Sequence, residues 1–216
     1  MKARKVKTIV LASQKGGAGK TTLAAHLAVA AERAGDGPCV MIDTDPQGSL
    51  AAWWNSREEE TPLFASSTIK DLPERLEMLD KGGCSYVFID TPPAITESIR
   101  AVVALADLVL IPTRPSPHDL RAVGHTVELV TGEQCPFAFV VTQAKPNTRL
   151  TIQAVTSLSE HGVVAPSIIH DRVDYAASMI DGRTVLEISG QNRSAEETVA
   201  LWWFVKARMT ASNKKR

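Results

Sequence analysis

The chain has 216 residues, of which 44% are hydrophobic, and its 24 lysines and arginines balance 24 aspartates and glutamates. This length and hydrophobic content are sufficient to bury a substantial core, and we expect one domain over residues 1–216. Because the charge is balanced, no overall basic field drives binding to nucleic acid. Such binding has to come from a local patch or from doubling of the charge on dimerisation.

The cysteines and the apolar segments exclude several further classes. Cys39, Cys84 and Cys135 are an odd, widely spaced set without C-x-x-C spacing, which argues against a disulfide framework, a zinc site or a cluster site. We expect reduced thiols in or near the core. The start at residues 1–5 is basic, but the apolar run after it is too short for a signal peptide, and no segment is long enough to cross a membrane. The sequence therefore predicts a soluble, cytoplasmic protein.

Short apolar runs alternate with helical segments along the chain. In chain order, strands are expected at residues 8–12, 39–42, 86–89, 108–111, 137–141 and 167–169. Among the helices between them, residues 22–33 are rich in alanine, residues 71–80 place leucines at i, i+4 and i+7, and residues 119–130 carry one apolar face. This alternation predicts an α/β fold, a doubly wound and mostly parallel sheet flanked by helices.

A glycine-rich loop follows the first expected strand and precedes the first expected helix. Its sequence from Lys15 to Thr22 is K-G-G-A-G-K-T-T. Glycines allow the backbone to curve and to approach a phosphate closely, and the N–H groups of the loop and helix N-terminus can bind the anion. The residues expected to hold the nucleotide here are Gly16, Gly17, Ala18, Gly19, Lys20, Thr21 and Thr22. Lys20 would reach the β- and γ-phosphates, and the Thr21 hydroxyl would ligate Mg²⁺.

The loop departs from the standard phosphate-binding pattern. That pattern, G-x-x-x-x-G-K-[ST], would place glycine at position 14, where this chain has Gln14, and the chain carries a second lysine, Lys15. One lysine is enough to hold a triphosphate within one subunit. The extra cation at the mouth of the loop therefore indicates a partner subunit.

Three aspartates follow the next two expected strands. Asp43 and Asp45 come after the second strand, and Asp90 follows the third. Because ligands of doubly wound sheets bind beyond the carboxyl ends of the strands, we expect these carboxylates to converge on the glycine loop. For Asp43 alone, capping of the following helix is an open alternative.

Three ordered motifs carry a family resemblance. The loop at 15–22, the segment D-T-D-P-Q-G-S at 43–49 and the segment F-I-D-T-P-P at 88–93 resemble the deviant Walker A ATPases typified by ParA and MinD. The resemblance covers nearly the whole chain, because P-T-R-P-S at 112–116 and V-V-T at 140–142 also fall where small ParA-like proteins have strand ends. It implies a P-loop ATPase that uses ATP and Mg²⁺.

The resemblance also implies roles for individual residues. The implied catalytic residues are Lys15, which would cross to the phosphates of a partner subunit, Lys20, and Asp45, which would orient the attacking water. The implied magnesium residues are Thr21, which would bind the ion directly, and Asp43 and Asp90, which would anchor its waters. The implied adenine site comprises Thr142, Gln143, Lys145, Pro146 and Asn147. Arg114 could touch the ribose or the dimer face, or could be a solvated arginine.

Two functions fit this family. In a ParA-like ATPase for plasmid or chromosome segregation or cargo positioning, ATP drives homodimerisation and non-specific DNA binding. A ParB/ParG-like or cargo adaptor protein then stimulates slow hydrolysis and releases the nucleoid-associated dimer. In the MinD-like alternative, the same ATP-dependent switch controls binding to a membrane. The apolar residues between Glu197 and Met209 precede the end of the chain, so we expect a last helix docked on the core and no stable membrane association. Metabolic relatives such as amidoligases or the nitrogenase reductase fit less well, since the latter needs cluster cysteines.

Several other residues have competing interpretations. His26 is expected to pack, and the pair Trp53–Trp54 is expected to be half-buried core, with a partner-binding surface as the alternative. The candidates for DNA contact are Lys145, Arg149, Arg172, Arg183, Lys206, Arg208 and the tail at residues 214–216. Surface lysines and arginines are common, so each of these could also be merely solvated.

Overall fold

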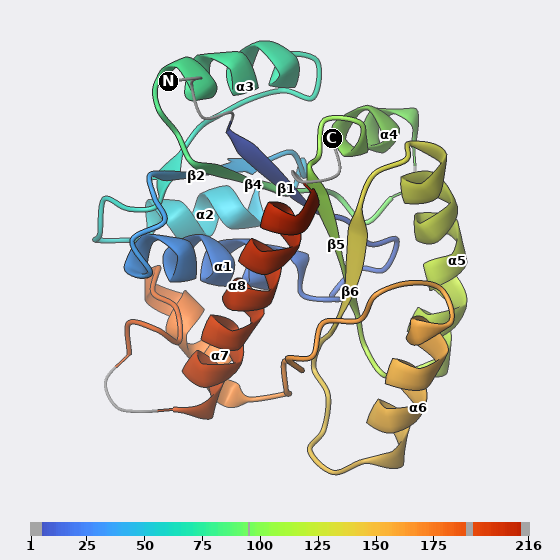
Figure 1. The fold of residues 1–216 in the computed structure, drawn as a ribbon. Helices are drawn as coiled ribbons and strands as arrows, with labels where there is room; N and C mark the ends of the chain where they lie inside the picture. Colours follow the sequence, from blue (N-terminus) through green and yellow to red (C-terminus); the bar gives the residue numbers. More distant parts are fainter. Residues whose placement is uncertain (1–5, 95, 189–191, 213–216) are drawn as a thin grey trace.

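The protein is built on one parallel sheet of six strands. A computed structural model describes residues 6–94, 96–188 and 192–212, with the side chains of the last two left out (Figure 1). The strands are β1 (Lys7–Leu11), β2 (Cys39–Asp43), β3 (Leu63–Phe64), β4 (Tyr86–Asp90), β5 (Leu108–Thr113) and β6 (Phe137–Val141). Their order is β3-β2-β4-β1-β5-β6, and every neighbouring pair is parallel. This confirms the expected doubly wound sheet.

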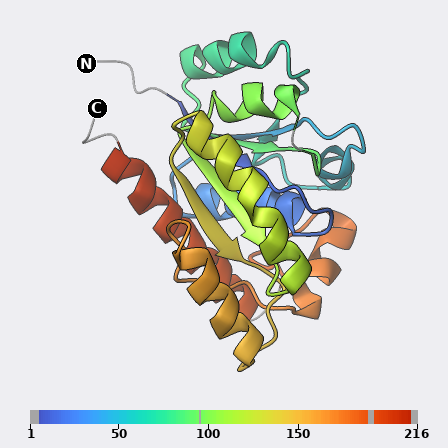
Figure 2. The ribbon, with the colours of Figure 1, turned by 90° about the vertical axis from the view of Figure 1, so that its right-hand side faces the viewer.

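Helices cover both faces of the sheet (Figures 1 and 2). They are α1 (Lys20–Arg33), α2 (Ser49–Asn55), α3 (Leu72–Lys81), α4 (Glu97–Val103), α5 (Pro117–Gly132), α6 (Arg149–Ser159), α7 (Val173–Ser178), the 3-10 helix η1 (Met179–Asp181) and α8 (Arg193–Ser212). One core layer joins the sheet to α1, α2, α7 and α8, and the other joins it to α3, α4, α5 and α6.

The strands are apolar without alternation because both of their faces are covered. In β1, Ile9 and Leu11 pack into the first core layer and Val10 into the second, and all three are fully buried. A strand buried on both sides has no polar face, which explains the continuous apolar runs in the sequence. Each run places its last residue, and the loop after it, at one edge of the sheet.

Most of the expected elements are confirmed to within two residues at their ends, but the strand expected at 167–169 is wrong. There the chain makes only isolated bridges, from Val164 to Phe139 and from His170 to Ala144. The N–H groups of Ala165 and Ile169 donate to the carbonyls of Phe139 and Val141. The two donors are four positions apart in the chain, but their acceptors in β6 are only two positions apart. The segment between Ala165 and Ile169 therefore bulges away from β6, and no regular ladder forms.

The last helix docks on the core as expected. Leu201, Trp202 and Val205 of α8 are fully buried, and α8 packs against α1. The Trp202 indole donates to Asp36 at 2.9 Å. The basic tail at 214–216 lies outside the described residues. Within the part of the chain that the structure describes, no helix combines the length and the apolar character needed to cross a membrane.

All three cysteines are buried, as predicted. Cys39 is fully buried, Cys84 is 7% exposed and Cys135 is 8% exposed, and none of them is in a disulfide. Burial raises the pKa of the Cys39 thiol far above its usual range, and burial likewise raises the pKa of Cys84 to about 11. Thiolates are therefore strongly disfavoured at these two positions.

Candidate functional site

The glycine loop connects β1 to α1 at the carboxyl edge of the sheet. Gly17 and Gly19 have positive φ values of 71° and 93°, which residues with a Cβ rarely adopt. Lys20 begins α1 and is 7% exposed. Burial lowers the pKa of this lysine, although Asp90 and Asp45 counteract the effect. The loop thus holds an ammonium group inside a curved backbone, with two carboxylates near it.

The end of β6 supports the loop from behind. The Thr142 hydroxyl donates to the carbonyl of Ala18 at 2.9 Å, and the Gln143 side-chain amide donates to the carbonyl of Gly17 at 2.6 Å. Both acceptors belong to the loop itself. Thr142 and Gln143, which are predicted to lie at the adenine, therefore fix the shape of the phosphate cradle. Nothing in the sequence motif indicates this supporting role.

Thr21 and Asp90 meet at the same edge. The Thr21 hydroxyl donates to Asp90 Oδ2 at 2.5 Å, and Asp90 is 1% exposed. Burial raises the pKa of Asp90 to about 7; the Thr21 hydrogen bond opposes this shift, and the neighbouring Asp43 adds to it. Asp90 Oδ1 is buried without a hydrogen-bond partner among the described residues. A buried, unsatisfied carboxylate oxygen is costly unless a ligand completes it.

These two residues fit a magnesium ion. Mg²⁺ binds nucleotides through one or two protein oxygens plus phosphates and waters. The Thr21 hydroxyl beside the Asp90 carboxylate, which has one oxygen without a partner among the described residues, supplies oxygens of this kind. Thr21 would hold the ion directly and Asp90 would hold its waters, and the bound ion would neutralise charge on the phosphates during their transfer.

Asp43 supports the helix that follows it. Its Oδ2 accepts from the N–H groups of Leu50 and Ala51 at 2.9 and 3.1 Å, and its Oδ1 accepts from the Asp45 N–H at 3.0 Å. The helix-capping alternative for Asp43 is therefore observed, at the start of α2. Asp45 is half-buried, and its Oδ1 accepts from the Gln47 N–H at 2.9 Å.

A cavity of about 190 Å³ opens beside the loop. Its lining comprises Gly19, Thr22, Leu23, Thr142, Gln143, Ile169, His170, Asp171, Arg172, Tyr175 and Ala176. The stretch from Ile169 onward follows the bulge and carries no motif that sequence reasoning could use. Lys145, Pro146 and Asn147 are exposed in the turn before α6 and are not among the lining residues. Their assignment to the adenine remains a prediction.

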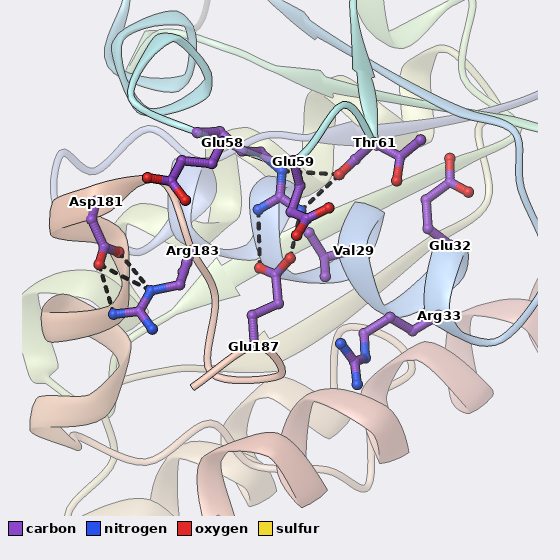
Figure 3. A pocket seen from close by; sticks show the side chains of 10 residues that line it. Val29, Glu32, Arg33, Glu58, Glu59, Thr61, Asp181, Arg183 and Glu187 are labelled. Atoms are coloured by element: carbon purple, nitrogen blue, oxygen red, sulfur yellow. Dashed lines mark hydrogen bonds and ion pairs between the residues drawn. The ribbon is translucent and has the colours of Figure 1, made fainter. Parts of the chain in front are cut away.

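A larger cavity, of about 460 Å³, lies at the opposite end of α1 (Figure 3). It is lined by Val29, Glu32, Arg33, Arg57, Glu58, Glu59, Thr61, Asp181, Arg183 and Glu187. Two pairs of its charges are neutralised within the wall, Arg57 with Glu187 and Arg183 with Asp181. This cavity contains no residue of the glycine loop and is separate from the candidate nucleotide site.

Several candidate DNA-contact residues make ion pairs. Arg172 pairs with Glu197 at 2.7 Å, and Lys206 pairs with Asp36 at 2.6 Å. Arg183 also donates to its carboxylate partner at 2.6 Å. Lys145 is exposed in the turn before α6, and Arg149 is exposed at the start of that helix. Among the described candidates, Lys145 and Arg149 are thus the two whose charges are most available to a partner.

Known proteins share this sequence pattern. Residues 9–185 match the model of the CobQ/CobB/MinD/ParA nucleotide binding domain. The chain belongs to this family. Among curated relatives, the maintenance of carboxysome distribution protein A of Gloeobacter kilaueensis is 34% identical over 88% of this chain and 89% of its own. The protein of the same name from Halothiobacillus neapolitanus is 28% identical over 92% of this chain and 95% of its own.

Solved structures agree on the fold. An ATP complex of McdA from Cyanothece superposes with a TM-score of 0.78 over 95% of this chain and 97% of its own, at 19% identity. The family match over residues 9–185 confirms the predicted resemblance to the ParA/MinD family. This family member is a nucleotide-binding protein, and its relatives indicate an ATPase.

Proposed function

We propose that this ParA/MinD-family member is a Mg²⁺-dependent ATPase whose ATP-bound form dimerises to position or segregate a cargo. The different burial of the two loop lysines supports this proposal best. Lys20 is buried near Asp90 and Asp45, whereas Lys15 is half-exposed at the rim of the loop. A lysine inside the cradle serves the nucleotide of its own subunit. A lysine at the rim is available to the nucleotide of a second subunit.

The neighbouring aspartates and threonine complete the chemistry. Phosphoryl transfer to water requires charge neutralisation and a positioned water. In the proposed cycle Asp45 orients that water, Thr21 ligates Mg²⁺, and Asp43 and Asp90 anchor the waters of the ion. Because Asp43 also caps α2, its carboxylate would link the metal site to the position of that helix. Hydrolysis is slow until an adaptor protein stimulates it.

The proposed partner of the dimer is non-specific DNA, bound through phosphate contacts. Dimerisation doubles any local basic patch, which raises affinity for a polyanion and makes that affinity salt-dependent. Lys145 and Arg149 are the favoured contacts because they are exposed. The ATP-bound dimer would then associate with the nucleoid in the cytoplasm, and an adaptor of the ParB/ParG or cargo type would release it.

Co-sedimentation with duplex DNA and, in parallel, with anionic liposomes tests the partner. Each would be run with ATP or ADP at two salt concentrations. We expect ATP-dependent pelleting with DNA that weakens at high salt, and no pelleting with liposomes. Pelleting with liposomes alone would replace this proposal by a MinD-like membrane function.

Two variants test the residue roles. Lys15→Gln should retain ATP binding but lose the ATP-dependent dimer, whereas the matched control Lys81→Gln, exposed at the end of α3, should dimerise normally. Asp45→Ala should bind ATP and dimerise but not hydrolyse. Unchanged turnover in this second variant would remove Asp45 from the mechanism.

A further inference from the structure

Arg114 is anchored to a buried carboxylate directly after β5. Its Nε donates to Asp119 Oδ1 at 2.9 Å, and Asp119 is 4% exposed. The Ser116 hydroxyl donates to Asp119 Oδ2 at 2.5 Å, and the Asp119 N–H donates back to the Ser116 hydroxyl at 3.2 Å. Both oxygens of the carboxylate are therefore occupied, which fixes the orientation of the arginine that it holds.

The rest of this guanidinium faces the glycine loop. A Cβ added to Gly17 would lie 3.6 Å from Nη1 of Arg114. Within residues 6–94, 96–188 and 192–212, neither Nη1 nor Nη2 of Arg114 has a hydrogen-bond partner. The side chain is 35% exposed, and Gly16 and Gly17 beside it are exposed as well. Arg114 therefore lies at the rim of the loop, with two donor groups available.

Lys15 occupies the same side of the rim. Residues 13–15 share a small cleft with residues 111–113 of β5 and with Asp119 at the start of α5. The anchor of Arg114 thus lies against the segment that carries Lys15. Two cationic residues, Lys15 of the loop and Arg114 after β5, therefore belong to neighbouring segments.

The chemistry of an arginine held in this way favours an anion outside its own subunit. A guanidinium remains charged at all relevant pH values and presents its N–H groups as a rigid fork, which suits phosphate and carboxylate oxygens. The phosphates of the subunit's own nucleotide would lie inside the loop, against its N–H groups and Lys20. The Nη groups lie at the rim instead, where they are available to an anion of a molecule that binds over the loop.

We infer that Arg114 binds an anionic group of a second copy of the chain across the ATP-bound dimer, and that Asp119 is its positioning residue. The inference rests on the proposed function, since it requires that the chain dimerise with ATP. The anion is either the triphosphate held by the second copy or a carboxylate on its facing surface. Both present the oxygens that a guanidinium fork recognises.

Substitution of Arg114 shows whether this arginine binds the second copy or only supports its own glycine loop. We expect Arg114→Ala to weaken the dimer at least ten-fold, measured by analytical ultracentrifugation with a non-hydrolysable ATP analogue. Its monomer should bind fluorescent ATP within two-fold of the parent affinity. Arg114→Lys should also weaken the dimer, because the single ammonium nitrogen of lysine cannot bind Asp119 and at the same time present a planar fork of donors at the rim. Arg121→Ala, which removes an exposed arginine of α5, is the matched control and should change neither constant.

The turnover rate distinguishes the two sources of the anion. If Arg114 contacts the partner's triphosphate, kcat of Arg114→Ala stays low even when subunits are concentrated enough to restore the dimer. If it contacts a carboxylate, kcat recovers at high protein concentration. Either result supports the inference.

Asp119→Asn tests the positioning role. It should weaken the dimer in the parent protein and have no further effect on the dimer in an Arg114→Ala background, although its effect on thermal stability persists in both. An additional loss of dimerisation in the double variant would show that Asp119 acts independently of Arg114.

Two results would overturn the inference while leaving the proposed function intact. One is a dimer constant for Arg114→Ala equal to that of the parent. The other is an equal loss of ATP affinity in the monomer, which would make Arg114 a support of its own loop. A parent chain that stays monomeric with ATP would overturn the proposed function itself, and this inference with it.

Discussion

Arg57 and Glu187 form a buried ion pair across 130 positions of sequence. Two hydrogen bonds join them, Nη2 to Oε1 at 2.5 Å and Nη1 to Oε2 at 3.0 Å, and their side chains are 3% and 12% exposed. Burial raises the pKa of Glu187, but the hydrogen bonds from Arg57 and Thr184 outweigh it, so the pKa is lowered overall. The pair ties the segment after α2 to the segment after η1.

Removing one partner of this pair should destabilise the fold. Arg57→Met leaves Glu187 partly buried without its cation, and such losses typically cost about 3 kcal/mol of the free energy of unfolding. Urea unfolding monitored by tryptophan fluorescence would measure the change. Arg183→Met, which removes an exposed pair with Asp181, should have a much smaller effect. Equal effects would mean that burial contributes nothing to the Arg57–Glu187 pair.

Gly182 should tolerate no side chain, because it lies directly against Arg57. An added Cβ would be 2.4 Å from the Cα of Arg57, and φ at Gly182 is +77°. Gly35 provides a matched control, since it has φ +74° and nothing within 4 Å of an added Cβ. We expect Gly35→Ala to cost about 1 kcal/mol, the usual penalty for a left-handed residue with a Cβ. Gly182→Ala should cost clearly more; equal losses on thermal unfolding would contradict the contact.

His26 should destabilise the protein in acid. It is fully buried; Val185 N–H donates to its Nε2, and its Nδ1 is 2.8 Å from the Thr22 carbonyl. Nδ1 therefore carries the proton and the ring is neutral. Burial lowers the pKa of His26 from 6.5 to about 4. The unfolded state thus binds more protons between these values, so stability is lost as the pH falls from 6.5 to 4, by about 3 kcal/mol in total.

Asp90 should have the opposite pH dependence in the metal-free protein. Its pKa is raised from 3.8 to about 7, so the folded state binds more protons in this window and stability falls as the pH rises from 3.8 to 7. Asp90→Asn should therefore raise the free energy of unfolding at pH 8 in EDTA by about 1–4 kcal/mol, the range set by one to three pKa units. It should also abolish the dependence of ATP binding on Mg²⁺.

The two opposing effects make the single variants informative. Between pH 4 and 6.5, the losses from His26 and Asp90 run in opposite directions and offset each other in part in the parent. Denaturation at a series of pH values should show stability falling with acid in Asp90→Asn and falling with base in His26→Asn. If both variants keep the profile of the parent, these two residues do not control it.

Thr142 should affect nucleotide affinity through the shape of the loop. Thr142→Val keeps the volume of the side chain but removes the donor to the Ala18 carbonyl, a loss of about 1 kcal/mol. We expect ATP affinity to fall about five-fold, which is the same energy expressed as a binding ratio. Isothermal titration calorimetry would measure it, with the exposed Thr131→Val as control. An unchanged affinity would show that the cradle keeps its shape without this bond.

The sequence was most informative where chemistry and burial both constrain it. Strands such as β1 and β4 are buried on two faces, so their sequences are continuous apolar runs that can be recognised. The glycine loop can be recognised because its phosphate ligand fixes the spacing of its glycines and lysines. β3 was missed because it has two residues at a sheet edge, with Leu63 47% exposed, too short for any periodicity. The bulge at residues 165–169 depends on how this segment pairs with β6, and a local sequence pattern cannot reveal such pairing.

The hydrogen bonds that support the glycine loop could not be predicted from the sequence either, because they also join residues far apart in the chain. Thr142 and Gln143 reach Gly17 and Ala18 across more than 120 positions, and no motif encodes a hydrogen bond to a backbone carbonyl. The capping role of Asp43 was foreseen as an alternative because a carboxylate after a buried strand commonly meets the next helix.

The burial of the three cysteines makes the native chain suitable for site-specific labelling. Cys39, Cys84 and Cys135 are shielded in the fold, so a maleimide dye should react slowly with all of them under native conditions. A single cysteine introduced at an exposed helical position, such as Arg121→Cys on α5, should then take the dye selectively. Energy transfer between two such labelled copies would follow subunit association in real time, with every native thiol left in place.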